Sequence, residues 1–432
     1  MAGKFSADKE REDRQKTSPA GNDSEKGDTA CGKMIKEGRY MLKDKTIEEI
    51  LRKQDTPCYI FDTQVLQERI GYLKTHLPEK LKLCYAIKAN PFVTRAAAGV
   101  TDRVELCSPG EINIGLKTGV RPEQMVISGV YKTPEYMEKL AAKYPDIGHY
   151  TVESMEQLAL LFNIGRTLKR RIPVLLRLTS GNQFGMDETE LFSIIRDREL
   201  YKEIDILGIQ YFSGTQKGTA RRIGRELLKL EALCTRLQEE ENFTVQELEY
   251  GGGFFVSYFQ EENFDEEGYL AEISALLQPL CEKTQVVLEL GRSIAASCGT
   301  YLTRIVDMKT NKKQKYLVVD GGIHQLVDYG QTMAMKHPMI RKWKADERME
   351  TEDCAICGSL CTVNDILVKQ YPLADPRIGD VLLFEKTGAY SMAEGIAMFL
   401  SRELPAVYLL DTDKKLKQVR AQIPVDSLLG EL

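Results

Sequence analysis

Eight short runs rich in apolar and β-branched residues, separated by longer amphipathic stretches, dominate the chain between residues 82 and 290. In chain order the runs are Lys82–Ile87, Arg103–Cys107, Gln124–Ser128, His149–Val152, Pro173–Leu178, Ile206–Phe212, Glu247–Tyr250 and Gln285–Leu290. The stretches between them have helical spacing, as in GRELLKLEALCTRLQEE and EGYLAEISALLQPLCEK. Alternation of strand and helix is typical of α/β proteins with a parallel sheet. Eight such units in about 210 residues predict a (β/α)8 barrel, with an open doubly wound sheet as the alternative.

The regions on either side of this segment have a different character. After Gly299 the helical spacing fades, and TYLTRIVDMKT, QKYLVVDGG, DVLLFEKTGAY and ELPAVYLLD alternate like strands, which predicts a β-rich C-terminal domain over residues 301–432. Residues 1–40 are charged and poor in large apolar groups, so we expect a disordered tail there. Residues 41–300 would hold the barrel and an N-terminal segment, with a helix near Thr46–Lys53 and a strand at Cys58–Phe61, that packs on the β-domain.

Composition and charge argue against several classes of function. The 432 residues include 59 Lys and Arg against 64 Asp and Glu, a net charge of −5, which does not suit a nucleic-acid partner. No run of about 18 uncharged apolar residues predicts a membrane span, and the N-terminus lacks the apolar core of a secretory signal. We therefore expect a cytoplasmic protein whose ten cysteines are reduced. Cys354, Cys357 and Cys361 lie close together, but no histidine pair accompanies them, so no metal site is predicted.

Three chemically useful groups fall at the ends of predicted strands, where barrel enzymes place their active sites. Lys88 ends the first strand, and partial burial there would lower its pKa and make it nucleophilic. Gly251–Gly253 end the seventh strand and would let the backbone approach an anion closely. Glu289 ends the eighth strand, and Arg292 beyond it could bind a phosphate with paired hydrogen bonds.

Each of these groups alone also has a structural explanation. Lys88 could extend to water, the glycines could form a turn, and Glu289 could pair with Arg292. Together they place an amine, an anion cradle and a carboxylate around one barrel mouth. Pyridoxal 5′-phosphate needs such a set, because a lysine binds its aldehyde, a cup holds its phosphate and an acid keeps its ring nitrogen protonated. The sequence therefore predicts pyridoxal phosphate as the cofactor.

The run CYAIKANP around Lys88 resembles the cofactor-lysine motif of the fold-type III decarboxylases, which include ornithine, arginine and diaminopimelate decarboxylases. The resemblance continues in the family's order through Gly251–Gly253, ELGR at 289–292, CGSLC at 357–361 with Asp365, and GAY at 388–390. It covers residues 56 to 410. It implies a barrel followed by a β-domain, decarboxylation of an α-amino acid, and a head-to-tail homodimer with shared active sites.

The resemblance also implies a role for each matching residue. Lys88 would hold the cofactor, Glu289 would contact the pyridine nitrogen, and Cys361 of the partner subunit would return a proton to Cα. The other implied cofactor-binding residues are Glu105, Phe212, Thr215, Gly251, Gly252, Gly253, Gly291, Arg292 and Tyr390, with Glu111 as a second acid near the lysine. A structural role for Cys361 stays open, because buried free cysteines are common.

Two positions depart from the family pattern. Phe212 stands where the family stacks a histidine on the cofactor ring, and it can stack without a polar edge or simply pack inside the barrel. Thr362 follows Cys361, where ornithine and diaminopimelate decarboxylases place an acid that faces a distal amine. Threonine cannot neutralise an ammonium, although Asp365 could compensate, so both residues are candidate substrate-binding residues.

These departures, with QFGMDE at 183–188 and FSGTQ at 212–216, resemble a subgroup from secondary-metabolite pathways. Its members decarboxylate modified or carrier-protein-linked amino acids, as the glutamyl-carrier decarboxylase of butirosin assembly does. We therefore expect a modified amino acid, carried by an acyl-carrier protein or free, as the substrate. The alternatives are a decarboxylase of free diaminopimelate, ornithine or lysine, a racemase of the same barrel class, and a non-catalytic regulatory homologue. An acid at position 289 favours decarboxylation over racemisation, because racemases of this type place an arginine at the ring nitrogen.

Overall fold

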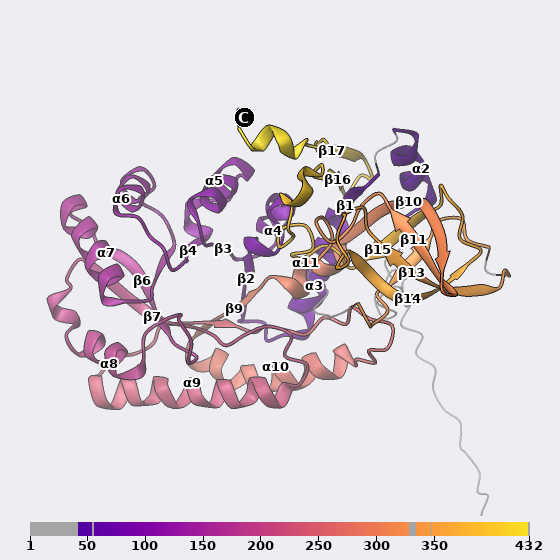
Figure 1. Ribbon diagram of the computed structural model, residues 1–432. Helices are drawn as coiled ribbons and strands as arrows, with labels where there is room; N and C mark the ends of the chain where they lie inside the picture. The colour runs from indigo at the N-terminus through magenta and orange to yellow at the C-terminus, as the bar shows by residue number, and fades with distance from the viewer. Residues whose placement is uncertain (1–41, 54–55, 328–333, 347, 431–432) are drawn as a thin grey trace, which may run out of the picture. The chain divides into compact units, whose positions relative to one another are not determined.

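The computed structural model describes residues 42–53, 56–327, 334–346 and 348–430 (Figure 1). The predicted tail at 1–40 lies outside these residues. Eight parallel strands close into a barrel in chain order, and β9 pairs back with β2, which confirms the predicted barrel and excludes the open sheet. The strands are β2 (Lys82–Ala86), β3 (Arg103–Leu106), β4 (Met125–Ile127), β5 (His149–Val152), β6 (Ile172–Leu178), β7 (Ile204–Phe212), β8 (Glu247–Gly251) and β9 (Gln285–Leu290).

Each barrel strand is followed by a helix. The helices are α4 (Thr94–Ala98), α5 (Pro109–Thr118), α6 (Pro134–Lys143), α7 (Met155–Leu168), α8 (Glu188–Arg196), α9 (Ala220–Glu241), α10 (Glu266–Lys283) and α11 (Arg292–Ala295). Several begin at a polar cap, since Ser108, Ser154 and Asp187 accept hydrogen bonds from backbone N–H groups of the first turn. The long helices α9 and α10 pack side by side (Figure 1). Because leucines and isoleucines recur every three or four residues along α9, one face of it is buried.

A second, mixed sheet lies outside the barrel. Its main order is β14-β13-β11-β10-β1-β16-β17, and β15 pairs with both β10 and β12. These strands are β1 (Cys58–Asp62), β10 (Gly299–Asn311), β11 (Gln314–Val319), β12 (Ile340–Lys342), β13 (Thr351–Cys357), β14 (Ile366–Ala374), β15 (Val381–Glu385), β16 (Ala406–Leu410) and β17 (Leu416–Arg420). Strand β1 precedes the barrel, between α2 (Asp44–Arg52) and α3 (Thr63–His76), yet it pairs with β10 and β16. The residue limits of the two predicted domains stay a prediction.

Two hydrogen bonds join the barrel to the loop that follows β15. The side-chain amide of Asn90 donates to the Gly388 carbonyl at 2.8 Å, and the Tyr390 N–H donates to the Ala89 carbonyl at 2.8 Å. Both contacts are made by the residues that directly follow Lys88, so the loop that carries Tyr390 is held close to the end of β2. No described helix has the length and apolar character to span a bilayer. Within the described ranges, no three His, Cys, Asp or Glu side chains gather closely enough to hold a metal ion.

Candidate active site

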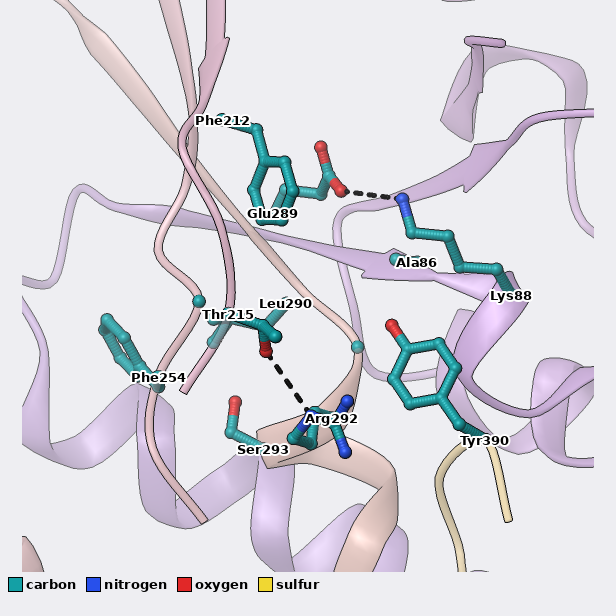
Figure 2. A pocket seen from close by; sticks show the side chains of 12 residues that line it. Ala86, Lys88, Phe212, Thr215, Phe254, Glu289, Leu290, Arg292, Ser293 and Tyr390 are labelled. Carbon is teal, nitrogen blue, oxygen red and sulfur yellow. Dashed lines mark hydrogen bonds and ion pairs between the residues drawn. The ribbon is translucent and has the colours of Figure 1, made fainter. Parts of the chain in front are cut away.

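A pocket lies at the carboxyl ends of strands β2, β7, β8 and β9 (Figure 2). It is lined by Ala86, Lys88, Phe212, Thr215, Gly253, Phe254, Glu289, Leu290, Gly291, Arg292, Ser293 and Tyr390. The position is the one that the barrel architecture reserves for catalysis. Eight of the predicted site residues therefore meet in one pocket, and they come from four strand ends and the loop after β15.

Lys88 stands directly after β2, in a single turn of 3-10 helix over Ile87–Ala89. Its Nζ lies 2.8 Å from Glu105 Oε2 and 3.5 Å from Glu289 Oε1, and Figure 2 shows Lys88 and Glu289 pointing toward one another. Burial lowers the pKa of the Lys88 amine, but the two carboxylates raise it more, to well above its usual value. The predicted lowering of this pKa is therefore wrong for the protein alone. The amine is held as an ammonium, and attack on an aldehyde requires that it first lose a proton.

The two carboxylates beside Lys88 hold different charges. Burial raises the pKa of Glu105, but the Lys88 ammonium lowers it more, so Glu105 is ionised. Burial and the charge of Glu105 together raise the pKa of Glu289 to about 7. Glu289 also accepts a hydrogen bond from Gln210 Nε2 at 3.2 Å, and Glu105 accepts one from the Cys107 thiol at 3.2 Å. The surroundings of the two acids thus move their pKa values in opposite directions, which is common at acid–base sites.

The opposite side of the pocket is suited to an anion. Arg292 opens α11, and its guanidinium donates to Thr215 Oγ1 at 3.3 Å and to the Tyr258 hydroxyl at 3.1 Å. The guanidinium also lies 4.7 Å from the centre of the Tyr390 ring. The Ser293 hydroxyl lines the pocket, yet it is buried without a hydrogen-bond partner among the described residues. A buried hydroxyl without a partner is costly, so this one indicates a bound group that completes its hydrogen bonding.

Glycines bring the backbone close to the same side of the pocket. Gly253 has φ +58°, and a Cβ added there would stand 2.1 Å from the Gly214 carbonyl oxygen. A Cβ at Gly251 would stand 2.4 Å from the Phe212 ring, so Phe212 can occupy its place only because residue 251 has no side chain. The amine and acids on one side, with the cation, hydroxyl and glycine cradle on the other, fit pyridoxal phosphate.

Several predicted residues lie outside the pocket lining. Glu105 pairs with the Lys88 amine without lining the pocket. Glu111 accepts a hydrogen bond from the Cys107 N–H at 2.7 Å. Gly251 ends β8, and Gly252 follows it before Gly253. Cys361 is exposed on the loop between β13 and β14 and does not line the pocket of its own chain, nor does Thr362.

The carboxylate of Asp365 is occupied by hydrogen bonds from two backbone N–H groups. Asp365 is buried, and its carboxylate accepts the Ile323 N–H at 2.8 Å and the Leu360 N–H at 2.7 Å. A Cβ at Gly358 would stand 2.3 Å from its oxygens. These contacts give Asp365 the task of shaping the loop that presents Cys361, and its role in binding substrate stays a prediction.

Sequence reasoning missed four residues that complete the site: Gln210, Cys107, Ser293 and Tyr258. Two of them carried a usable signal. Gln210 lies two residues before Phe212 in β7, and Cys107 lies two residues after Glu105, so strand alternation places each pair on the same face. Tyr258 carried no such signal, because it belongs to an irregular segment after the glycines.

Replacing Gly253 with alanine is expected to weaken cofactor binding by at least about tenfold. The new Cβ would collide with the Gly214 carbonyl, and an alanine at φ +58° is strained, so the backbone on the anion side of the pocket must move. Titration of the purified protein with pyridoxal phosphate, followed by visible absorption, measures the change. Gly181 has φ +96° but nothing within 4 Å, so Gly181→Ala is the control for strain without a collision. Equal losses in both variants would contradict the close approach proposed at Gly253.

Comparison with known proteins places this geometry in a family. Residues 63–296, more than half of the chain, match the model of the pyridoxal-dependent decarboxylase, pyridoxal binding domain. A diaminopimelate decarboxylase from Aquifex aeolicus is 25% identical, with 83% of this chain and 87% of its own length aligned. The L-glutamyl-[BtrI acyl-carrier protein] decarboxylase of Niallia circulans is 24% identical, with 90% and 96% aligned.

The solved structures agree with this match. The crystal structure of diaminopimelate decarboxylase from Helicobacter pylori complexed with L-lysine superposes with a TM-score of 0.78 at 25% identity, covering 88% of this chain and 98% of that one. The racemase and the non-catalytic alternatives gain no support from any of these matches. The chain belongs to the pyridoxal-dependent decarboxylase family and is a pyridoxal phosphate-dependent amino-acid carboxy-lyase.

Proposed function

We propose that this enzyme decarboxylates an α-amino acid whose side-chain end is modified or attached to an acyl-carrier protein. The observation that carries the proposal is the absence of an available acid on the loop after Cys361. Thr362 takes the position of the acid, and the carboxylate of Asp365 is already bound by two backbone N–H groups. A cation approaches the same loop, because Arg402 Nη2 donates to the Ser359 carbonyl at 2.9 Å. A distal ammonium finds no charge partner there, whereas an acylated end needs none.

The residues on the phosphate side act by binding and orientation. Arg292 supplies the charge opposite the phosphate, Thr215 and Ser293 supply hydroxyls, and Gly253 lets the backbone approach. Phe212 lies against Gly251 and presents an apolar ring to the pocket. Because this ring cannot titrate, its contribution to binding does not change with pH.

The residues on the amine side of the pocket bind and position protons. Pyridoxal phosphate, when bound through Lys88, supplies an electron sink for the pair of electrons left on Cα as carbon dioxide departs. Glu289 holds a proton at the ring nitrogen, which keeps that sink effective. Ionised Glu105 pairs with the Lys88 ammonium, and hydrogen bonds from Lys88 and Cys107 hold its two oxygens in place.

The last proton transfer needs a second copy of the chain. Cys361 does not line the pocket of its own chain, so we propose a head-to-tail homodimer in which Cys361 of the partner subunit returns a proton to Cα. Cys361 is exposed and nearby Val363 is 88% exposed, which suits a loop that a second subunit covers.

A decarboxylase of free diamino acids is the second candidate. The Aquifex and Helicobacter relatives carry the name diaminopimelate decarboxylase, and the Helicobacter structure holds L-lysine. This candidate requires an acid near the distal amine, which the described part of the Cys361 loop does not offer.

A comparison of substrates by carbon dioxide release separates the two candidates. We expect kcat/KM for a side-chain N-acylated diamino acid, or for a carrier-linked amino acid, to exceed that for free lysine, ornithine or diaminopimelate by at least about tenfold. Thr362→Glu is expected to shift the preference toward the free diamino acids, because it restores a charge partner for the ammonium. Thr362→Ser is the matched control and should keep the wild-type preference. Efficient turnover of free lysine or ornithine, with none of the acylated analogues, would refute the proposal.

A further inference from the structure

A buried ionic network lies directly behind the anion side of the pocket. Its centre is Lys217, whose side chain is 0% exposed and whose Nζ donates to Glu226 Oε2 at 2.7 Å. The same amine lies 3.4 Å from the Tyr250 hydroxyl and 3.4 Å from the Gly251 carbonyl. Tyr250 donates to Glu226 at 2.7 Å, and the Ser213 hydroxyl donates to the other oxygen of Glu226 at 2.6 Å. None of these residues lines the pocket.

Stability alone does not account for this network. Burying a charged pair has a desolvation cost that an apolar pair of similar volume avoids, so replacing such a pair with apolar residues is often neutral or stabilising. A buried charged pair can instead serve to hold the chain in one particular arrangement. Glu226 is on α9, Ser213 and Lys217 are on the loop after β7, and Tyr250 is on β8, so the network joins three elements at one point.

Two of the joined segments carry the residues proposed to bind the phosphate. The loop after β7 contributes Thr215, and the segment after β8 contributes Gly253. The backbone of Lys217 links these two segments to each other and to α10. Its N–H donates to the Gly253 carbonyl at 2.9 Å, and its carbonyl accepts the Tyr269 hydroxyl at 2.6 Å.

These contacts determine which way the backbone near the phosphate faces. In a trans peptide the C=O and N–H point in opposite directions. Because the Gly253 carbonyl faces Lys217, the N–H of Phe254 is turned away from Lys217, and both Gly253 and Phe254 line the pocket. Lys217 Nζ holds the Gly251 carbonyl in the same way, so the next N–H, that of Gly252, also points away from the amine.

We propose that Lys217 and Glu226 are positioning residues for the cofactor phosphate. They hold the loop after β7 and the glycine segment after β8 in the one relative position that lets Thr215 and the backbone at Gly253 and Phe254 face the same anion. The inference rests on the proposed phosphate-binding role of Thr215, Gly253 and Arg292. It predicts that the network controls recognition of the phosphate and leaves the reaction of the aldehyde with Lys88 unchanged.

The test compares pyridoxal phosphate with pyridoxal, which has the same ring and aldehyde but no phosphate. Dissociation constants are measured for both by equilibrium dialysis on cofactor-free protein that circular dichroism shows to be folded. In Lys217→Met and in Glu226→Gln, affinity for pyridoxal phosphate should fall by about tenfold, while affinity for pyridoxal should change less than about twofold. Glu231→Gln, on the same helix but in an exposed pair with Lys283, should change neither.

A double variant separates positioning from stability. Lys217→Met alone leaves the Glu226 carboxylate beside a buried apolar side chain, and Lys217→Met with Glu226→Gln removes that charge. The double variant should therefore regain thermal stability relative to Lys217→Met but keep the reduced affinity for pyridoxal phosphate. If Lys217→Met does not fold, Tyr250→Phe, which removes one hydroxyl from the network, should still lower pyridoxal phosphate affinity selectively.

Three outcomes would overturn the inference. Equal losses of affinity for pyridoxal phosphate and pyridoxal would show a general structural role. Unchanged affinity for both, in folded variants, would show that the loops hold their position without the network. A wild-type protein that binds pyridoxal as tightly as pyridoxal phosphate would refute the phosphate-binding assignment itself, and the inference with it.

Discussion

Lys88→Ala is expected to abolish the visible absorption that purified protein shows with pyridoxal phosphate, and to lower carbon dioxide release by roughly 10³-fold or more. The reason is geometric. The Lys88 amine is in the pocket and is held by Glu105 at 2.8 Å and Glu289 at 3.5 Å, so its removal leaves two acids and no amine to bind the aldehyde. Absorption spectra and a carbon dioxide assay on both proteins measure the effect.

A second lysine at the barrel mouth provides a strict control. Burial lowers the pKa of Lys132 to about 8, which would make it the better nucleophile by pKa alone. Its Nζ, however, is bound to the Gly129 carbonyl at 2.7 Å and to Gln157 Oε1 at 3.0 Å, and it does not line the pocket. Lys132→Met should therefore keep the absorption band. A band that survives in Lys88→Ala and disappears in Lys132→Met would reassign the cofactor lysine.

Mixing inactive chains extends the same prediction to the dimer. If each site combines Lys88 of one chain with Cys361 of the partner subunit, a mixture of Lys88→Ala and Cys361→Ala chains contains dimers with one intact site. After subunit exchange, equal amounts should recover about a quarter of wild-type activity. Activity that stays at the level of the separate variants would contradict a shared site.

The barrel could be predicted from the sequence because strand and helix patterns are local. The predicted runs at His149–Val152 and Gln285–Leu290 match β5 and β9 residue for residue, and the other barrel strands differ from their predicted runs by at most two residues at an end. Closure of the barrel, in contrast, is not a local property of the sequence. It depends on the pairing of β2 with β9, in which Lys82 faces Val287, and no local pattern carries a contact across that separation. The eight strand–helix units predicted closure only because chains with eight such units commonly fold as closed barrels.

The site was predictable as a set of residues but not as an electrostatic arrangement. Lys88, Glu105 and Glu289 end different strands, and the sequence places them at the same barrel mouth without giving their distances. Burial alone would lower the pKa of Lys88, as predicted, but two carboxylates within 3.5 Å reverse the sign. Strand alternation places Gln210 on the same face as Phe212, but its role depends on the distance of its amide from Glu289, which no local pattern gives.

Glu289→Gln is expected to make the cofactor-free protein more stable above pH 7 and the enzyme much less active. Burial and the ionised Glu105 raise the pKa of Glu289 from 4.5 to about 7. Between these pH values the folded chain holds a proton that the unfolded chain has released, so the stability of the wild type falls as pH rises through this window and levels off above it. The glutamine variant lacks this titration, so its advantage should grow over the same window to roughly 1–3 kcal/mol.

The loss of activity has a separate cause. A glutamine amide cannot keep the ring nitrogen protonated, so we expect kcat to fall by roughly 10²- to 10³-fold. Urea denaturation of cofactor-free protein at pH 5 and pH 8, with kcat for the holoenzyme, measures both effects.

Glu249 provides the matched control for Glu289→Gln. It is a fully buried acid of β8 outside the pocket, whose pKa burial raises well above its usual value. The same linkage applies to Glu249, so Glu249→Gln should also gain stability over wild type as pH rises, but turnover should stay unchanged because Glu249 lies outside the pocket, which makes it the control for the loss of activity. A Glu289→Gln variant that is less stable than wild type at pH 8 would mean that the Glu289 carboxylate stabilises the fold through Lys88 and Gln210. The barrel would then hold this acid for its structure, whereas the opposite result would show that the protein keeps a destabilising acid where its chemistry requires one.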